Sequence, residues 1–170
     1  MSEKDKIIKE KLFYKGIVNL SEAYEYAYSF LREGEEYGIT EEYYSEKIAG
    51  ESKDVEIKWV ATKKVTDYFK INLDIKWKVL GMKNIEVEID GKKKEMNKVS
   101  ELSIDIKGVL EKDYNSKWES NPTHKFFKEM YHKYVIPQRT EKKENDVIEM
   151  VQKFKDEMKA FLDLTGRGLK

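Results

Sequence analysis

Histidine is the side chain that most often transfers protons near neutral pH, and the chain contains two, His124 and His132. Both fall on one predicted helix, about 12 Å apart along its axis and about 80° apart around it. Side chains placed in this way cannot hold one metal ion together. Either could act as a general base, but no partner side chain is identifiable. We therefore interpret both as surface residues.

Asp74 and Asp105 are the carboxylates best placed to act as a pair, because both lie on the polar side of predicted long strands. Paired acids can divide into proton donor and acceptor when burial separates their pKa values. Lys70, Lys76 and Lys107 surround them, however, and favour cross-strand ion pairs on a solvated face. The chain has no cysteine, which excludes thiolate catalysis and sulfur-ligated zinc. We predict no catalytic residues, no metal site and no cofactor.

Lys92, Lys93 and Lys94 follow a predicted hairpin turn and could contact a phosphate backbone. Lysines at a strand edge also prevent pairing between chains, and we favour that role. Lys plus Arg number 33 and Asp plus Glu number 33, so the formal charge is zero. A protein that wraps nucleic acid normally has a basic excess. Nucleic acid is therefore not an expected partner.

Aromatic residues are the one compositional excess, with 11 Tyr, 7 Phe and 3 Trp. Trp59 and Trp77 fall on the apolar side of neighbouring predicted strands, and Tyr131 falls on the inner face of a predicted helix. One interpretation is an ordinary aromatic core, because large rings dominate core burial. The other is a cavity between the sheet and the C-terminal helices, in which Trp59, Trp77 and Tyr131 bind an apolar ligand.

The elements that position these residues begin with a long alternation of apolar and polar side chains from Val55 to Tyr114. Successive side chains of a strand point to opposite faces, so the pattern predicts a sheet with one buried and one solvated face. The predicted strands carry apolar residues at 55–61, 69–79, 85–89 and 102–106, with a brief return strand at 92–96. Asp90-Gly91 is a strong hairpin signal.

The spacing of the core residues also constrains the loop between the first two long strands. The core residues of the first two long strands are all odd-numbered, so the loop between them must contain an odd number of residues or a bulge. A tight two-residue turn at Thr66-Asp67 would place Tyr68, and not Phe69, on the core face. We therefore predict a longer or bulged turn.

For the N-terminal half, the sequence predicts a charged stretch at 1–11 that frays, a short strand at 12–18 and a helix from Leu20 to about Gly34. Asn19 is a suitable N-cap, with Glu22 completing a capping box. A second, shorter helix is predicted from Thr40 to Ile48.

Two helices are predicted after the sheet. Pro122 begins the first and Pro137 ends it, while Asp146 opens the last, which ends near Gly166 and leaves 166–170 as a tail. Its apolar positions 147, 151, 154, 158 and 161 have the spacing of a coiled-coil seam. The helix 146–164 could pack on its own domain, or associate with a second copy or a partner protein.

The order of elements predicts an α+β fold: an antiparallel meander sheet of about four to six strands, with N-terminal and C-terminal helices packed on one face. A length of 170 residues suits a single domain, residues 1–170. Residues 1–11 lack the apolar stretch of a signal peptide, and no segment has the length of a membrane span. We therefore expect a cytoplasmic protein.

Several motifs resemble those of a family of small archaeal proteins of unassigned function: Thr66-Asp67-Tyr68-Phe69-Lys70, Asp90-Gly91-Lys92-Lys93, Glu111-Lys112-Asp113-Tyr114, Lys117-Trp118 and Tyr131-His132-Lys133-Tyr134. The resemblance implies an archaeal, cytosolic protein and transfers no catalytic residue. The element order also resembles the helix-grip (START/Bet v 1-like) scaffold, in which a curved sheet wraps a C-terminal helix around a cavity. The chain departs from that scaffold by one strand fewer and by a terminal helix split at Pro137.

Four functional hypotheses follow. The first is a non-enzymatic binding module that recognises an unknown partner. The second is a carrier or sensor of a small apolar ligand. The third is an enzyme with His132 or Tyr134 turned into a cavity, and the fourth is nucleic-acid binding.

Overall fold

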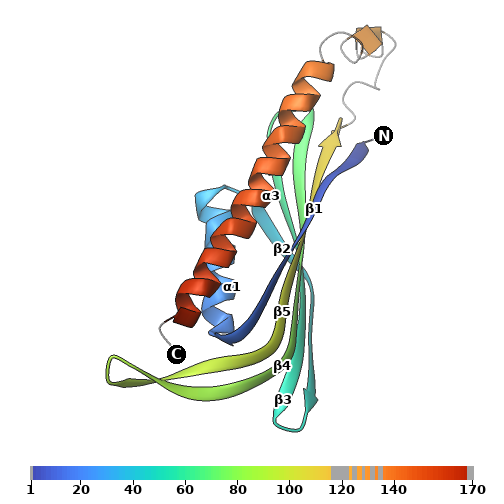
Figure 1. Cartoon of the computed structure of the whole chain (residues 1–170). Helices are drawn as coiled ribbons and strands as arrows, with labels where there is room; N and C mark the ends of the chain where they lie inside the picture. Colours follow the sequence, from blue (N-terminus) through green and yellow to red (C-terminus); the bar gives the residue numbers. More distant parts are fainter. Residues whose placement is uncertain are drawn as a thin grey trace.

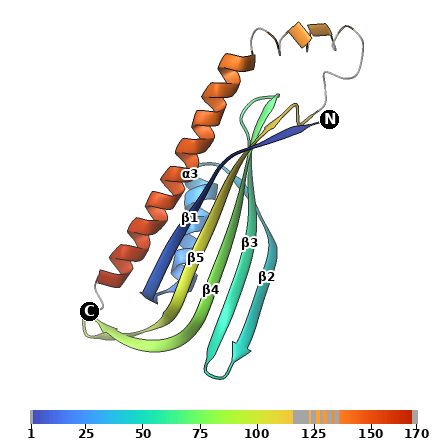
Figure 2. The same ribbon diagram turned by 45° about the vertical axis from the view of Figure 1, so that its right-hand side comes forward.

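The computed structural model describes residues 2–115, 123, 126–127, 129–130, 133 and 136–167. It confirms the α+β fold, with one five-stranded antiparallel sheet in the order β1-β5-β4-β3-β2. Two helices, α1 and α3, pack on one face of this sheet (Figures 1 and 2). The strands are β1 (Glu3–Val18), β2 (Gly38–Ala49), β3 (Ser52–Lys64), β4 (Phe69–Ile89) and β5 (Lys92–Lys112).

The hydrophobic core lies between the sheet and the helices and follows the predicted alternation. Cross-strand partners such as Trp59 with Ile75, and Trp77 with Ile104, bring buried side chains together on one face. Because the side-chain period of a strand is two, the intervening polar residues all face away from the helices. That second face carries the candidate site.

The turn between β3 and β4 confirms the parity argument. Lys64 pairs with Lys70, and the amides of Val65 and Thr66 both donate to the carbonyl of Phe69, at 3.0 and 3.1 Å. Thr66 Oγ1 accepts from the amide of Phe69 at 2.9 Å and fixes the loop. The turn is therefore longer than two residues and leaves Phe69 buried.

The hairpin at Asp90-Gly91 is confirmed, with Ile89 paired to Lys92 and both turn residues at positive φ, 52° and 76°. The separate strands predicted at 69–79 and 85–89 are wrong, because β4 is continuous. Gly81 adopts φ 62° and bends the strand without ending its pairing with β5. β5 is likewise one strand, and the far ends of both strands curve round toward the ends of the helices (Figure 1).

The helix predicted from Thr40 to Ile48 is wrong, because this segment is the edge strand β2. Gly50, at φ 65°, lies in the tight turn that joins β2 to β3. Most β2 side chains are exposed and a register shift separates Glu41 from Tyr43. The alternation that identifies a strand is therefore absent from this part of the sequence.

The N-terminal stretch that we expected to fray is part of β1, which begins at Glu3 and pairs with β5 along its length. Lys112 binds Asp5 across this pair at 2.7 Å. A register shift lies between Lys6 and Ile8, and it breaks the alternation here too. Sequence analysis therefore placed the start of the strand too late.

Helix α1 (Leu20–Ser29) starts as predicted, because the side chain of Asn19 accepts from the amide of Glu22. A single π-helical turn, η1 (Phe30–Gly34), follows it. The long helix α3 (Ile136–Arg167) includes Pro137 in its first turn, so Pro137 does not split it and Asp146 does not open it. The helix predicted before Pro137 lies partly outside the described residues, and those of its residues that the structure describes, 123, 126–127, 129–130 and 133, are helical.

The coiled-coil seam predicted on the last helix is used within the domain. Four of its residues, Val147, Val151, Phe154 and Met158, are buried, and the fifth, Phe161, is partly buried against the same core. Phe161 stacks on Tyr26 of α1, with ring centroids 4.6 Å apart. Self-association through this face stays a prediction, and it would require α3 to leave the sheet.

Gly108 of β5 marks the closest approach of α3 to the sheet, and it generates a first prediction. A Cβ at this position would lie 2.5 Å from Val147 Cγ1 and 2.9 Å from Val151 Cγ2. Both neighbours are β-branched and cannot rotate freely away. We expect Gly108→Ala to lower the free energy of urea-induced unfolding by about 1–3 kcal/mol through overpacking.

Two variants control this measurement. A Cβ at Gly34 meets no atom within 4 Å, so Gly34→Ala should be neutral or stabilise the fold by about 0.4–1 kcal/mol. Val147→Ala should reduce the additional cost of Gly108→Ala in the double variant. Equal effects of Gly108→Ala and Gly34→Ala would contradict the proposed close contact.

Candidate functional site

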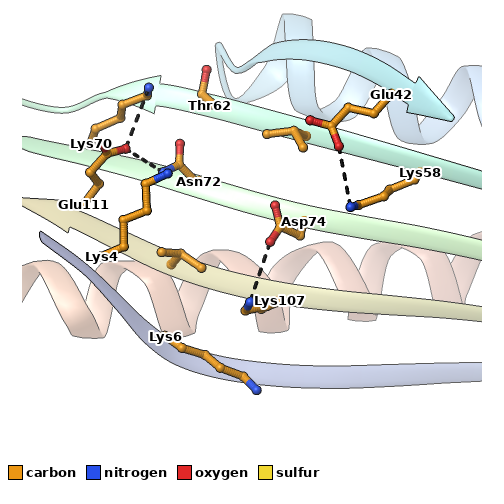
Figure 3. Close-up of a pocket in the computed structure, with 12 residues that line it drawn as sticks. Lys4, Lys6, Glu42, Lys58, Thr62, Lys70, Asn72, Asp74, Lys107 and Glu111 are labelled. Atoms are coloured by element: carbon orange, nitrogen blue, oxygen red, sulfur yellow. Dashed lines mark hydrogen bonds and ion pairs between the residues drawn. The ribbon is translucent and has the colours of Figure 1, made fainter. Parts of the chain in front are cut away.

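The helix-free face of the sheet contains a hollow of about 480 Å³ to which all five strands contribute (Figure 3). We call it the lysine groove. It is lined by Lys4, Lys6, Glu42, Lys58, Val60, Thr62, Lys70, Asn72, Asp74, Lys107, Val109 and Glu111. Its volume lies within the range of about 300–1,000 Å³ that is usual for ligand sites.

The sheet register explains why these side chains meet. On β4 the even-numbered residues are opposite in parity to the buried odd-numbered ones, so they face away from the helices. Antiparallel pairing then places Asp74 opposite Lys107 and Lys70 opposite Glu111. The groove is therefore the polar counterpart of the core and is fixed by the same register.

A bulge lets β1 contribute to both faces. Lys6 is opposite Val109, but after the register shift Ile8 is opposite Gly108. Lys4 and Lys6 consequently line the groove, whereas Ile8 packs against the core on the helix side. An extra residue in one strand reverses its parity, and this is why Lys6 and Ile8, two residues apart, lie on opposite faces.

The groove carries a positive excess, with five lysines and three carboxylates. Each carboxylate is paired with a different lysine: Glu42 with Lys58 at 3.6 Å, Glu111 with Lys70 at 3.8 Å, and Asp74 with Lys107 at 3.9 Å. These distances exceed a normal hydrogen bond, so the pairs are loose. Lys4 and Lys6 supply the two additional charges.

Glu111 and Asn72 form the floor of the groove and are only 7% and 8% exposed. Asn72 Nδ2 donates to Glu111 Oε2 at 2.9 Å. Burial raises the pKa of Glu111, but hydrogen bonds from Asn72 and Ser2 and the charges of Lys70 and Lys4 outweigh it, so the pKa is lowered overall. The floor is thus an ionised, fixed acceptor at neutral pH.

Asp74 and Asp105, the carboxylates that the sequence places best for pairing, each lie beside a lysine. Asp74 pairs with Lys107, and Asp105 lies 3.8 Å from Lys11. Both contacts are the cross-strand ion pairs that the sequence favoured. Of the hairpin lysines, Lys94 binds Glu22 of α1 at 2.6 Å.

Trp59 and Trp77 lie on the opposite face from the groove and are fully buried. Their rings are 5.4 Å apart, and Tyr24 and Tyr28 of α1 lie 4.7 and 6.2 Å from Trp59. A ligand would reach these residues only if α1 moved, and their role in ligand binding stays a prediction. Tyr131 lies outside the described residues, as do His124, His132, Trp118 and Tyr134.

Sequence analysis did not find the groove. The polar parity of β4 and β5 was visible, and it placed Lys70, Asp74 and Lys107 on one face. The contributions of β1 and β2 were not, because both strands were missed or shortened and both contain bulges. The groove depends on those two edge strands for its width.

Comparison of the chain with protein-family models, curated proteins and solved structures found no match. The resemblances to an archaeal family and to the helix-grip scaffold therefore remain predictions. Within the described residues, none of the helices combines the length and apolar character needed to cross a membrane.

The lowered pKa of Glu111 predicts a pH-dependent contribution to stability. A depressed folded-state pKa stabilises the protein above the unfolded value of 4.5, and the contribution disappears as pH falls through the folded value. Glu111→Gln should lower the free energy of unfolding by about 1 kcal/mol at pH 7. The two unfolding curves should converge below about pH 4.

Glu101 provides the matched control, because it is an exposed carboxylate on the same strand. Glu101→Gln should change the stability little at any pH. A difference between wild type and Glu111→Gln that stays constant from pH 7 to pH 3 would show that the charge of Glu111 does not stabilise the fold.

Proposed function

We propose that the protein is a cytosolic, non-enzymatic binding module whose lysine groove receives an extended, acidic segment of a partner protein. The observation that supports this most directly is the excess of lysine over carboxylate in a hollow that crosses all five strands. An acidic partner would complement this charge, and electrostatic complementarity contributes mainly to specificity and to the rate of association.

The lysines of the groove are available to a partner. Exposed ion pairs contribute only about 0–1 kcal/mol each, and the two exposed pairs, Glu42 with Lys58 and Asp74 with Lys107, lie at 3.6 and 3.9 Å. Little stability is therefore lost when an ammonium group turns from Asp74 or Glu42 to an incoming carboxylate. Lys4 and Lys6 are exposed on the edge strand β1, and they can bind a partner without breaking one of the three ion pairs of the groove.

A protein segment fits the groove better than a nucleic acid. Glu42, Asp74 and Glu111 are distributed among the lysines and would repel a continuous phosphate backbone. Among the described residues, the lining contains no aromatic side chain on which a base could stack. A peptide can place acidic side chains on the lysines and its own amides on the carboxylates. A contact of this size is expected to be weak and transient.

Charge reversal at the edge of the groove tests this proposal. The double variant Lys4→Glu/Lys6→Glu converts five lysines and three carboxylates into three and five. We expect a fluorescein-labelled hexaglutamate peptide to bind the wild-type protein at low salt. The double variant should bind it about tenfold more weakly or worse, equivalent to about 1.4 kcal/mol. Fluorescence anisotropy measures both affinities.

Lys92→Glu/Lys93→Glu is the matched control, since it makes the same change in net charge at the end of the β4–β5 hairpin. It should leave peptide binding unchanged. An equal loss in both double variants would indicate a response to net charge alone and contradict a groove site. Tighter binding of oligothymidylate than of hexaglutamate would replace the proposed partner with a nucleic acid.

A further inference from the structure

A second hollow, of about 360 Å³, lies on the helix side of the sheet between the first turns of α1 and strands β2 and β3. We call it the tyrosine pocket. It shares no residue with the lysine groove. It is lined by Leu20, Ser21, Tyr24, Glu25, Glu41, Tyr44 and Ile57.

The lining of this pocket has the opposite charge to that of the groove. In the part of the chain that the structure describes, it includes two carboxylates, Glu25 and Glu41, and no lysine, arginine or histidine. The remaining walls are the rings of Tyr24 and Tyr44 and the side chains of Leu20 and Ile57. Carboxylates beside aromatic faces are the surroundings that bind ammonium groups, by charge and by cation–π attraction.

A bulge in β2 brings Glu41 and Tyr44 to the same side. Glu41 is opposite Trp59 and Tyr44 is opposite Ile57, and both of those partners are buried on the helix face. Glu42, next to Glu41 in the strand, lines the lysine groove, and the register shift between Glu41 and Tyr43 returns Tyr44 to the helix side. Without the extra residue, Glu41 and Tyr44 would point to opposite faces.

Glu41 is held in place by a chain of contacts that ends in the core. The Tyr24 hydroxyl donates to Glu41 Oε2, and the Tyr24 ring packs edge-on against Trp59. Burial, followed by the hydrogen bond to Glu41, raises the pKa of Tyr24 to about 12, so the phenol remains a donor. The phenol thus fixes one oxygen of the carboxylate and leaves the other for a ligand.

An unpartnered polar atom lies directly behind the pocket. Trp59 Nε1 is buried and makes no hydrogen bond, although it lies close enough to the Tyr24 phenol to lower its pKa. Buried donors without an acceptor are rare, and Trp77 Nε1 on the neighbouring strand is a second one. The Tyr24 phenol oxygen is the polar atom of the pocket wall nearest in kind to an acceptor for Trp59.

We propose that the tyrosine pocket binds a small organic ammonium ion. Its cation pairs with Glu41 and Glu25, and its hydrocarbon part packs against Tyr24, Tyr44 and Ile57. A hydrogen bond from the Tyr44 hydroxyl to Glu46, at 2.5 Å, fixes the position of the Tyr44 ring. This site is independent of the proposed partner of the lysine groove, because the two sites lie on opposite faces.

The test compares two probes of the same shape, 2-phenylethylammonium and 2-phenylethanol, by isothermal titration calorimetry with the full chain. The ammonium should bind, and the neutral alcohol should bind at least about tenfold more weakly, because it lacks the charge that pairs with Glu41. Amide resonances of Ser21 and Glu41 should shift on titration with the ammonium. Comparable binding of both probes, or no binding of the ammonium, would overturn the proposal.

Conservative variants locate the site. Glu41→Gln keeps the shape of the side chain and should weaken ammonium binding about tenfold, and Glu25→Gln should weaken it less. Glu22→Gln is the matched control, since Glu22 is on the same helix but binds Lys94 outside the pocket. An equal loss in Glu22→Gln would overturn the proposal, as would unchanged binding in Glu41→Gln. Lys4→Glu/Lys6→Glu should leave ammonium binding intact, which separates this test from that of the groove.

Discussion

The contact between α3 and β5 at Gly108 is the packing interaction on which the arrangement of both faces depends. The missing Cβ allows Val147 and Val151 to lie directly on the strand. A helix of 32 residues is about 48 Å long, so α3 covers the sheet along much of its length. With α1 beside it, the helices bury the apolar residues of the central strands on one face, and the polar residues of the same strands are left to form the other.

The register of the sheet links the core to the groove. A one-residue slip of β4 would place Lys76 or Lys78 in the core instead of Trp77. Burial of the tryptophans therefore fixes the register of the strand, and with it the face on which the lysines lie. The two edge strands depart from this rule where their register shifts, at two positions in β1 and one in β2. The register shifts near Lys6 and Glu42 reverse parity once each, and each reversal adds side chains to a candidate site.

The difference between central and edge strands explains what could be predicted from the sequence. β3, β4 and the core half of β5 alternate cleanly because one face is buried, and their core residues and hairpin turns were predicted correctly. β2 was mistaken for a helix, and β1 was started too late, because bulges and exposure remove the alternation. Separate strands were predicted at 69–79 and 85–89, although Gly81, at φ 62°, bends β4 and lets it continue. Pro137 is equally compatible with ending one helix and beginning another, and the residue alone does not distinguish these outcomes.

Net charge was the weakest guide to function. It is a sum over the whole chain, whereas the fold gathers charges of different sign at different sites. The chain has 33 basic and 33 acidic residues, yet the groove gathers five lysines around three carboxylates and the tyrosine pocket contains two carboxylates and no cation. At physiological ionic strength the Debye length is about 8 Å, so a ligand responds to the charges of its own site and not to the total. Adjacent residues of β2, Glu41 and Glu42, belong to different sites on different faces. A neutral composition is therefore compatible with two binding sites of opposite charge, and the sheet register, together with two bulges, determines which residues belong to each.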